Sequence, residues 1–256
     1  MNHDEDPMDD NGHGTHVAGI IAARPASAAI PKGAIAHWQF NESVWASVNG
    51  EVSDSVGTHE GTAYFGAQPV AGGIGGRAAH FDGAHSFVSL ERIPALGTSF
   101  TVSGWFNTSS LTGNGGSEIT GSWLSSRNAF VLSPNIDNTV SFYVFVSNQW
   151  VGATSPPGTM ILGDWEHWAG SYDGSAVRLY KNGHAVAQTP ASGNVMATDR
   201  FCIGADCSTE AEWRVDGCYS SRVLQEYHYD EGIDDYNSRL MTCSGSQICS
   251  DGACVI

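Results

Sequence analysis

Short runs in which apolar and polar residues alternate recur along the middle of the chain. In the run from 99 to 107, Phe100, Val102 and Phe106 fall on one face and Trp105 on the other, which is the period of a β-strand. The runs are separated by Asp-Gly and Asn-Gly pairs, which are turn signals. The predicted strands cover residues 34–40, 62–66, 77–83, 86–90, 99–107, 139–147, 166–174 and 176–183. Many short strands with almost no helical periodicity predict an all-β sandwich of two antiparallel sheets.

The pattern divides the chain into four segments. Residues 1–23 are acidic and polar and become helix-like from His13 to Ala23, and residues 24–33 form a linker rich in Ala and Pro. The β-rich domain extends over residues 34–236. Residues 237–256 form a small polar tail that contains cysteines.

Composition limits the possible ligands. The chain holds 31 Gly and 15% charged residues, which suits strands joined by tight turns rather than a helical bundle. Its net charge of −16 repels phosphate backbones and argues against a nucleic-acid partner. Two interpretations of this acidity stay open, namely simple solubility outside the cell and attraction for cations such as calcium.

The cysteines indicate an oxidising compartment. Their even number and their position late in the chain favour disulfides, and none has the CxxC spacing of a zinc or thioredoxin motif. They are Cys202, Cys207, Cys218, Cys243, Cys249 and Cys254. Cys202 and Cys207 form the favoured local pair, although the pattern leaves the connectivity open.

No apolar run is long enough for a transmembrane segment. No signal peptide precedes the domain, so we expect the true N-terminus to be missing from a secreted or cell-surface bacterial protein.

The segment Asp9–Ile21, DDNGHGTHVAGII, resembles the catalytic-histidine motif of subtilisin-like serine proteases. The resemblance implies that His13 corresponds to the general base. A triad also needs an orienting carboxylate and a serine. Ser99, in a GTSF run, sits in a strand pattern and is interpreted as a coincidence. We therefore expect residues 1–23 to be a loosely docked remnant, so that the domain stays folded without residues 1–32.

Six patches in order resemble the laminin G-like branch of the concanavalin A-like superfamily. They are AHWQF (36–40), GRAAHFDG (76–83), FVSL (87–90), LGTSFTVSGWF (96–106), WEHWAGSYDG (165–174) and VRLYKNG (177–183). The resemblance implies a jelly-roll sandwich whose rim and sheet face carry ligands. Trp105 and Trp168, in strand patterns, are expected in the core, whereas Trp123 and Trp150 flank irregular stretches and are candidate binding residues.

Two aspartates are candidate calcium ligands. Asp82 follows Phe81 in the FDG turn, near a loop where related modules often bind calcium, although an Asx turn that caps its own backbone is the favoured alternative. Asp216 lies in a last family-like patch whose register is one residue short. Asp173-Gly174 and Asn182-Gly183 are interpreted as plain turns.

Three functions follow from these patterns. The first is a non-catalytic module that binds a polysaccharide, another glycan or an extracellular protein and that is appended to a secreted hydrolase. The second is a truncated or fused subtilisin-like peptidase. The third is a glycan-active enzyme on the same fold, which would need paired carboxylates in an ExDxxE-like run that the sequence lacks.

We predict that calcium stabilises the domain through Asp82. A ligand that binds only the folded state at a hundredfold excess over its Kd adds about 2.7 kcal/mol. Millimolar calcium should therefore raise the Tm by several degrees, and magnesium should raise it less because it gives up its water reluctantly. Calorimetry of the parent and of Asp82→Asn checks this. A melting curve that calcium does not move would show that Asp82 is only a turn residue.

Overall fold

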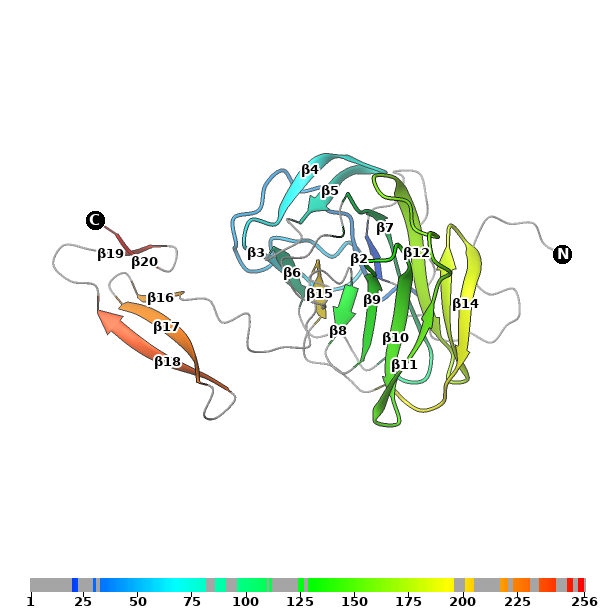
Figure 1. Ribbon diagram of the computed structural model, residues 1–256. Coiled ribbons are helices and arrows are strands. Elements are labelled where there is room, and N and C mark those ends of the chain that lie inside the picture. The colour runs from blue at the N-terminus through cyan, green and yellow to red at the C-terminus, as the bar shows by residue number, and fades with distance from the viewer. Residues whose placement is uncertain are drawn as a thin grey trace. The chain divides into compact units, whose positions relative to one another are not determined.

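A computed structural model describes the sandwich and several strands of the tail. The described residues are 20–22, 30, 33–81, 86–90, 96–109, 111, 124–126, 129–195, 201–204, 217–220, 223–230, 235–242, 248–250 and 253–255. The chain divides into two compact units, Met1–Ser208 and Thr209–Ile256 (Figure 1). Every regular element in the described part is a β-strand, which confirms the predicted all-β class. No helix found there is long and apolar enough to span a membrane.

Two sheets form the first unit, and Figure 1 shows them as layers. Sheet A contains, in spatial order, β14 (His184–Pro190), β13 (Ala176–Lys181), β12 (Trp165–Tyr172), β7 (Phe100–Asn107), β1 (Ile20–Ala22) and β2 (Ala36–Trp38). Sheet B contains β11 (Gln149–Thr154), β10 (Val140–Val146), β9 (Phe130–Pro134), β8 (Leu124–Ser126), β15 (Phe201–Ile203), β6 (Phe87–Leu90) and β3 (Gly61–Tyr64). A separate hairpin is formed by β4 (Gln68–Gly73) and β5 (Gly76–His80) at one end of the sandwich.

Alternation along the strands determines which side chains enter the core. On β7 the predicted inner residues Phe100 and Val102 are buried, whereas Phe106, near the end of the strand, is only half-buried. The ring of Phe100 lies 5.6 Å from that of Phe130 and 6.2 Å from that of Phe142, both on sheet B. These aromatic contacts join the two sheets, and such pairs add to the free energy gained from burying their area.

Each of the eight predicted runs contains a strand, while β8, β9, β11, β14 and β15 lie outside those runs. The two predicted turns are also confirmed. Asp173 accepts backbone hydrogen bonds from Ser175 and Ala176, which makes an Asx turn. Asn182 and Gly183 both have positive φ, as the tight turn between β13 and β14 requires.

The structure differs from the sequence expectation at β1. Ile20–Ala22 was expected to be part of a helix in a loosely docked remnant, but it is a parallel strand between β2 and β7. Ile21 is paired with His37 on one side and with Ser103 on the other. The isoleucines are β-branched and favour a strand, and the sheet offers backbone partners on both sides. Residues 1–19 and most of the linker lie outside the described residues.

The second unit contains two small sheets. One is made of β16 (Gly217–Ser220), β17 (Val223–Asp230) and β18 (Asp235–Thr242), and the other of β19 (Ile248–Ser250) and β20 (Ala253–Val255). The unit begins at Thr209, whereas the sequence pattern sets the end of the domain at Tyr236. Cys202 on β15 is disulfide-bonded, and its pairing with Cys207 stays a prediction.

We predict that the stability of the sandwich depends on β1 and not on the residues before it. Deletion of residues 1–19 should leave the Tm unchanged. Deletion of residues 1–29 removes β1 and leaves β2 and β7 without this partner, so the Tm should fall by several degrees, with about 1 kcal/mol for each 2–4 °C. Thermal unfolding followed by circular dichroism checks both chains. Equal melting temperatures would restore the expectation that the whole N-terminal segment is dispensable.

Candidate functional site

The hairpin of β10 and β11 presents a row of side chains on the outer face of sheet B. The turn consists of Ser147 and Asn148, both with positive φ, and such two-residue turns fix the register of the strands. Phe142 and Val144 of β10 point into the core and are fully buried. The residues between and after them, Tyr143 and Phe145, therefore lie on the outer face.

Three aromatic side chains form this surface, which we call the β10–β11 aromatic face: Tyr143, Phe145 and Trp150. Phe145 is paired across the strands with Trp150, and their ring centroids are 5.3 Å apart. Trp150 is 42% exposed and Tyr143 is 38% exposed. Large apolar side chains gathered on a surface in this way are typical of a binding site.

Gly152 allows the ring of Tyr143 to lie flat against β11. These two residues are paired across the strands, and a Cβ atom added to Gly152 would lie 2.1 Å from Cδ1 of Tyr143. Any other residue at this position would displace the ring. The absence of a side chain at Gly152 thus keeps one face of the tyrosine on the strand and leaves the other available.

Hydroxyl groups continue the row beyond the aromatic face. The next pair on the same face is Ser141 with Thr154, whose hydroxyl oxygens are 2.8 Å apart. The side-chain amide of Asn135 donates to the hydroxyl of Ser141 at 2.9 Å. Ser141 is buried, so the exposed Thr154 is the hydroxyl of this pair that a ligand can reach.

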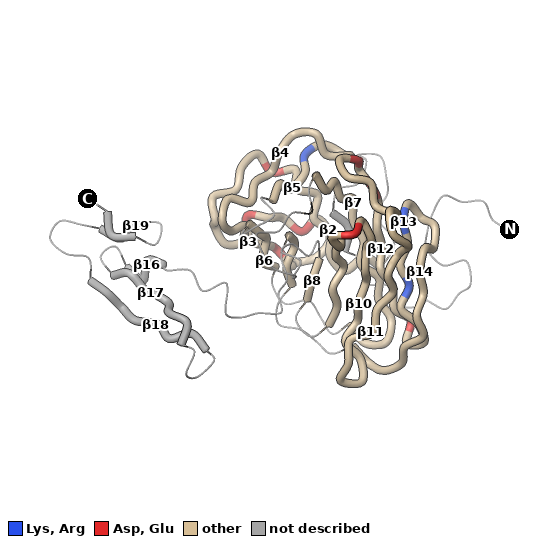
Figure 2. Tube along the Cα trace, in the orientation of Figure 1, with Lys and Arg blue, Asp and Glu red and all other residues tan. Residues whose placement is uncertain are grey.

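This part of the chain is almost free of charge. Between residues 129 and 163 only Asp137 is charged, and Figure 2 shows β10 and β11 without acidic or basic residues. The hydroxyl and the backbone N–H of Thr139 donate to Asp137 and lower the pKa of its carboxyl group, so the group is ionised at neutral pH. The only charge within residues 129–163 is therefore negative.

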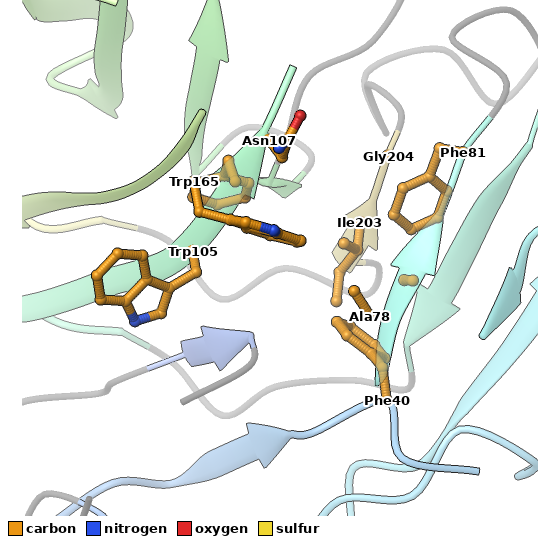
Figure 3. A pocket seen from close by; sticks show the side chains of 10 residues that line it. Phe40, Ala78, Phe81, Trp105, Asn107, Trp165, Ile203 and Gly204 are labelled. Atoms are coloured by element: carbon orange, nitrogen blue, oxygen red, sulfur yellow. The ribbon is translucent and has the colours of Figure 1, made fainter. Parts of the chain in front are cut away.

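A second candidate is a pocket at the end of the sandwich (Figure 3). Its volume is about 100 Å³, and aromatic rings from several separate elements line it. The lining residues are Phe40, Ala78, Ala79, Phe81, Trp105, Phe106, Asn107, Trp165, Ile203 and Gly204. In Figure 3 the indole of Trp165 lies between the strand that carries Asn107 and the side chain of Ile203.

Local constraints hold the walls of this pocket. Phe40 has a φ of 56°, a left-handed backbone that costs a bulky residue on the order of 1–3 kcal/mol. Its ring packs edge-on against Trp45, which helps to fix it there. On the opposite side, the indole N–H of Trp165 donates to the carbonyl oxygen of Gly72 at 3.2 Å and ties β12 to the β4–β5 hairpin.

The carboxylate of Glu166 faces the interior of the protein. Glu166 is only 4% exposed, and its oxygens accept from the indole N–H of Trp168 at 3.2 Å and pair with the ammonium group of Lys181 at 2.5 Å. Lys181 also donates to the carbonyl oxygen of Thr159. These contacts fasten the loop after β11 to sheet A, and they give Glu166 a structural role instead of a position against a substrate.

The structure tests only some of the residues singled out by sequence. Trp168 is fully buried, as expected, and Trp150 is exposed on the aromatic face, while its role in binding stays a prediction. Trp105 is only half-buried and stands on the outer face of β7, with its ring 5.4 Å from His167, so it is not a core residue. Ser99 lies directly before β7, so the GTSF run leads into a strand.

The remaining predictions fall on residues that the structure does not describe: His13, Asp82, Trp123 and Asp216. In the described ranges there is no group of three or more His, Cys, Asp or Glu residues arranged to hold a metal ion. Calcium binding by Asp82 and Asp216 and the correspondence of His13 to a protease base stay predictions.

Sequence reasoning missed Tyr143, Phe145 and the whole end pocket. The run SFYVFVS already places Tyr143 and Phe145 on one face of a strand, opposite Phe142 and Val144. The missing signal was the turn, because Ser147-Asn148 lacks the glycine that usually marks a hairpin. No sequence pattern predicts the pocket, because its residues come from separate parts of the chain.

Two sheets, antiparallel in all pairings except those of β1, pack around an aromatic core and make the first unit a jelly-roll β-sandwich. The family model described as the Concanavalin A-like lectin/glucanases superfamily matches residues 81–218, more than half of the chain. The chain belongs to this superfamily. A search of curated protein sequences finds no match.

Several solved structures are similar to the chain. Domain 4 of AbnA, a GH43 extracellular arabinanase from Geobacillus stearothermophilus in complex with arabinotriose, matches with a TM-score of 0.48 and 23% identity over 60% of this chain and 78% of its own. Domains LG4-5 of the mouse laminin alpha1 chain match with a TM-score of 0.39 and 14% identity, covering 63% and 40%. The carbohydrate-binding module CBM66 from Bacillus subtilis gives 0.34 and 11%, covering 57% and 88%.

We predict that Lys181→Met destabilises the sandwich because it leaves the buried carboxylate of Glu166 without its cation. Removal of one partner from a buried pair costs roughly 3 kcal/mol. The double variant Glu166→Gln with Lys181→Met removes both charges and should recover most of the loss. Urea unfolding of the parent and the two variants gives these free energies. If the double variant is no more stable than Lys181→Met alone, the ion pair does not explain the effect.

Proposed function

We propose that the sandwich is a non-catalytic module of an exported protein and binds uncharged carbohydrate on the β10–β11 aromatic face. The observation that carries this proposal is the exposure of Tyr143 and Trp150 beside Phe145 on one strand pair. Aromatic rings offer sugar rings a flat apolar surface, and Thr154 at the end of the row supplies a hydroxyl for hydrogen bonding.

The charges favour a neutral ligand. The net charge of the chain is −16, and Asp137 is the only charged residue near the face between residues 129 and 163. A uronic acid or a sulfated sugar would meet repulsion there, and residues 129–163 supply no cation to offset it. Sugars without ionised groups avoid this cost, so we expect neutral chains to bind and acidic ones to bind weakly.

Binding is favoured over hydrolysis for this surface. The superfamily includes both lectins and glucanases by its description, so membership alone leaves the two open. Glycoside hydrolysis needs two carboxyl groups on either side of the scissile bond. Along β10 and β11 there is no acidic residue, and Glu166 on β12 is paired with Lys181 inside the protein.

The row also suggests how a chain would lie. Successive pairs on one strand face are about 6.6 Å apart, because each residue rises about 3.3 Å. The distance along β10 from Ser141 to Phe145 is therefore about 13 Å, the length of two to three sugar rings on the order of 5 Å each. A linear oligosaccharide along the strand would contact Thr154, Tyr143 and Trp150 in turn.

We predict that Trp150→Ala abolishes most glycan binding without unfolding the domain. Removal of an aromatic anchor costs about 2 kcal/mol, which is a roughly thirtyfold weaker Kd. A glycan array identifies a neutral ligand, and calorimetry then measures its Kd for the parent, Trp150→Ala and Tyr143→Ala. Phe65→Ala is the matched control, because Phe65 is equally exposed at 42% but lies between β3 and β4.

Three results would contradict the proposal. One is an array on which the parent binds no neutral glycan. Another is a bound glycan whose Kd is the same for the parent, Trp150→Ala and Tyr143→Ala. A loss shared equally by Phe65→Ala would point to general destabilisation and would also count against a site on β10 and β11.

A further inference from the structure

We propose that the pocket at the end of the sandwich is a second binding site, distinct from the β10–β11 aromatic face, and that it takes a single uncharged aromatic ring of a small molecule. This inference does not depend on the proposed carbohydrate function, because the two sites share no residues. It rests on the size of the pocket, on the chemistry of its lining and on the way its walls are held.

The rings that line the pocket come from sheet A and from the end of the β4–β5 hairpin, and sheet B contributes Ile203. Phe106 and Trp165 belong to β7 and β12 of sheet A, and Phe81 follows β5. Figure 3 shows Phe81 and Trp165 on opposite sides of the hollow, with Ile203 of sheet B between the two walls. Aromatic groups that converge from several elements on one hollow are a common feature of ligand sites.

The size of the pocket fits one ring. Its volume is about 100 Å³, and an apolar cavity of about 150 Å³ accommodates benzene. Water in such a hollow finds few hydrogen-bonding partners, so its replacement by an apolar group is favourable. A larger ligand would have to extend out of the pocket past its rim.

The lining indicates that the ligand is uncharged. None of the ten lining residues that the structure describes is acidic or basic, and apart from the indole N–H groups Asn107 supplies their one polar side chain. Asn107 stands at the edge of the hollow in Figure 3, and its amide donates to the carbonyl oxygen of Gly163 at 2.8 Å. A charged group pushed among these rings would lose its hydration without a compensating partner. A polar substituent on the ligand would therefore lie at the rim, near Asn107.

An aromatic ring suits these walls better than a saturated one. Aromatic groups gain from edge-to-face and offset contacts beyond the area that they bury. That difference corresponds to roughly a threefold to tenfold tighter Kd for an aromatic ring than for a saturated ring of similar size.

The pocket is held open by features that do not need a ligand. Phe81 is placed beside Gly204, where an added Cβ atom would lie 2.5 Å from the ring, so this wall depends on the glycine. Trp165 is tied to Gly72 of the β4–β5 hairpin by its indole N–H. A preformed site loses little conformational entropy when it binds, so even a small ring should bind measurably.

The test titrates the full chain with four probes of similar size and follows binding by NMR: benzyl alcohol, cyclohexylmethanol, benzoate and benzylamine. Benzyl alcohol should bind most tightly, threefold to tenfold better than cyclohexylmethanol. The two charged probes should bind at least roughly tenfold more weakly than benzyl alcohol, because the lining offers them no partner.

Two variants locate the site. Trp165→Ala removes one wall and should weaken benzyl alcohol binding at least about tenfold. Ala79→Leu adds bulk to the lining while it keeps every ring, and it should weaken binding to a similar extent even if Trp165→Ala fails to fold. Trp150→Ala is the control on the other face and should leave the affinity for benzyl alcohol unchanged.

The outcomes separate this inference from the carbohydrate proposal. Loss of ring binding in Trp165→Ala and Ala79→Leu, with glycan binding retained, supports a second site. The inference is overturned if benzyl alcohol does not bind the parent, if both pocket variants bind it like the parent, or if cyclohexylmethanol or a charged probe binds equally well. Those results would leave the predicted effect of Trp150→Ala on glycan binding untouched.

Discussion

The two sheets can approach each other closely because residue 170 is a glycine and carries no side chain. Gly170 of β12 faces Phe142 of β10, and a Cβ atom at position 170 would lie 2.2 Å from the ring. The ring of Phe142 therefore occupies the space that a side chain on β12 would need. The contact lies beside Phe100, whose ring is close to both Phe130 and Phe142. Together these residues determine how β7 and β12 of sheet A face β9 and β10 of sheet B.

This core contact also determines the outer surface. Because the side chains of a strand alternate, burial of Phe142 and Val144 places Tyr143 and Phe145 on the outside of sheet B. A slip of one residue would exchange the two sets and expose the core residues. The turn of Ser147 and Asn148 then brings Trp150 opposite Phe145. The binding face is thus fixed by the same register that packs the interior, and a variant that disturbs Phe142 should disturb both.

The two candidate sites depend on the fold in different ways. The β10–β11 aromatic face comes from one hairpin of about fifteen residues, and its geometry is set by local pairing. The end pocket needs the ends of β7, β12 and β15 together with the β4–β5 hairpin, so it forms only when the whole sandwich is assembled. Ring binding in the pocket should therefore be the more sensitive of the two to changes at a distance, including the loss of β1 from the middle of sheet A.

The sequence by itself determined the class of fold and eight of the strands, because alternation with a period of two is a local property and Asp-Gly and Asn-Gly turns mark where it stops. It also singled out Trp150 as a candidate binding residue, and the structure places that side chain at the surface. Only the tertiary structure decided that Tyr143 and Phe145 lie beside Trp150. The sequence does not predict this hairpin, because its turn, Ser147-Asn148, lacks the glycine that usually marks one. The tertiary structure also decided that Glu166 pairs with Lys181 inside the protein. It likewise placed Ile20–Ala22 in sheet A as a strand, where the sequence predicts a helix. These outcomes depend on residues that are distant in the chain, and the period of a pattern carries no information about which distant segments meet. Packing between the sheets supplies that information.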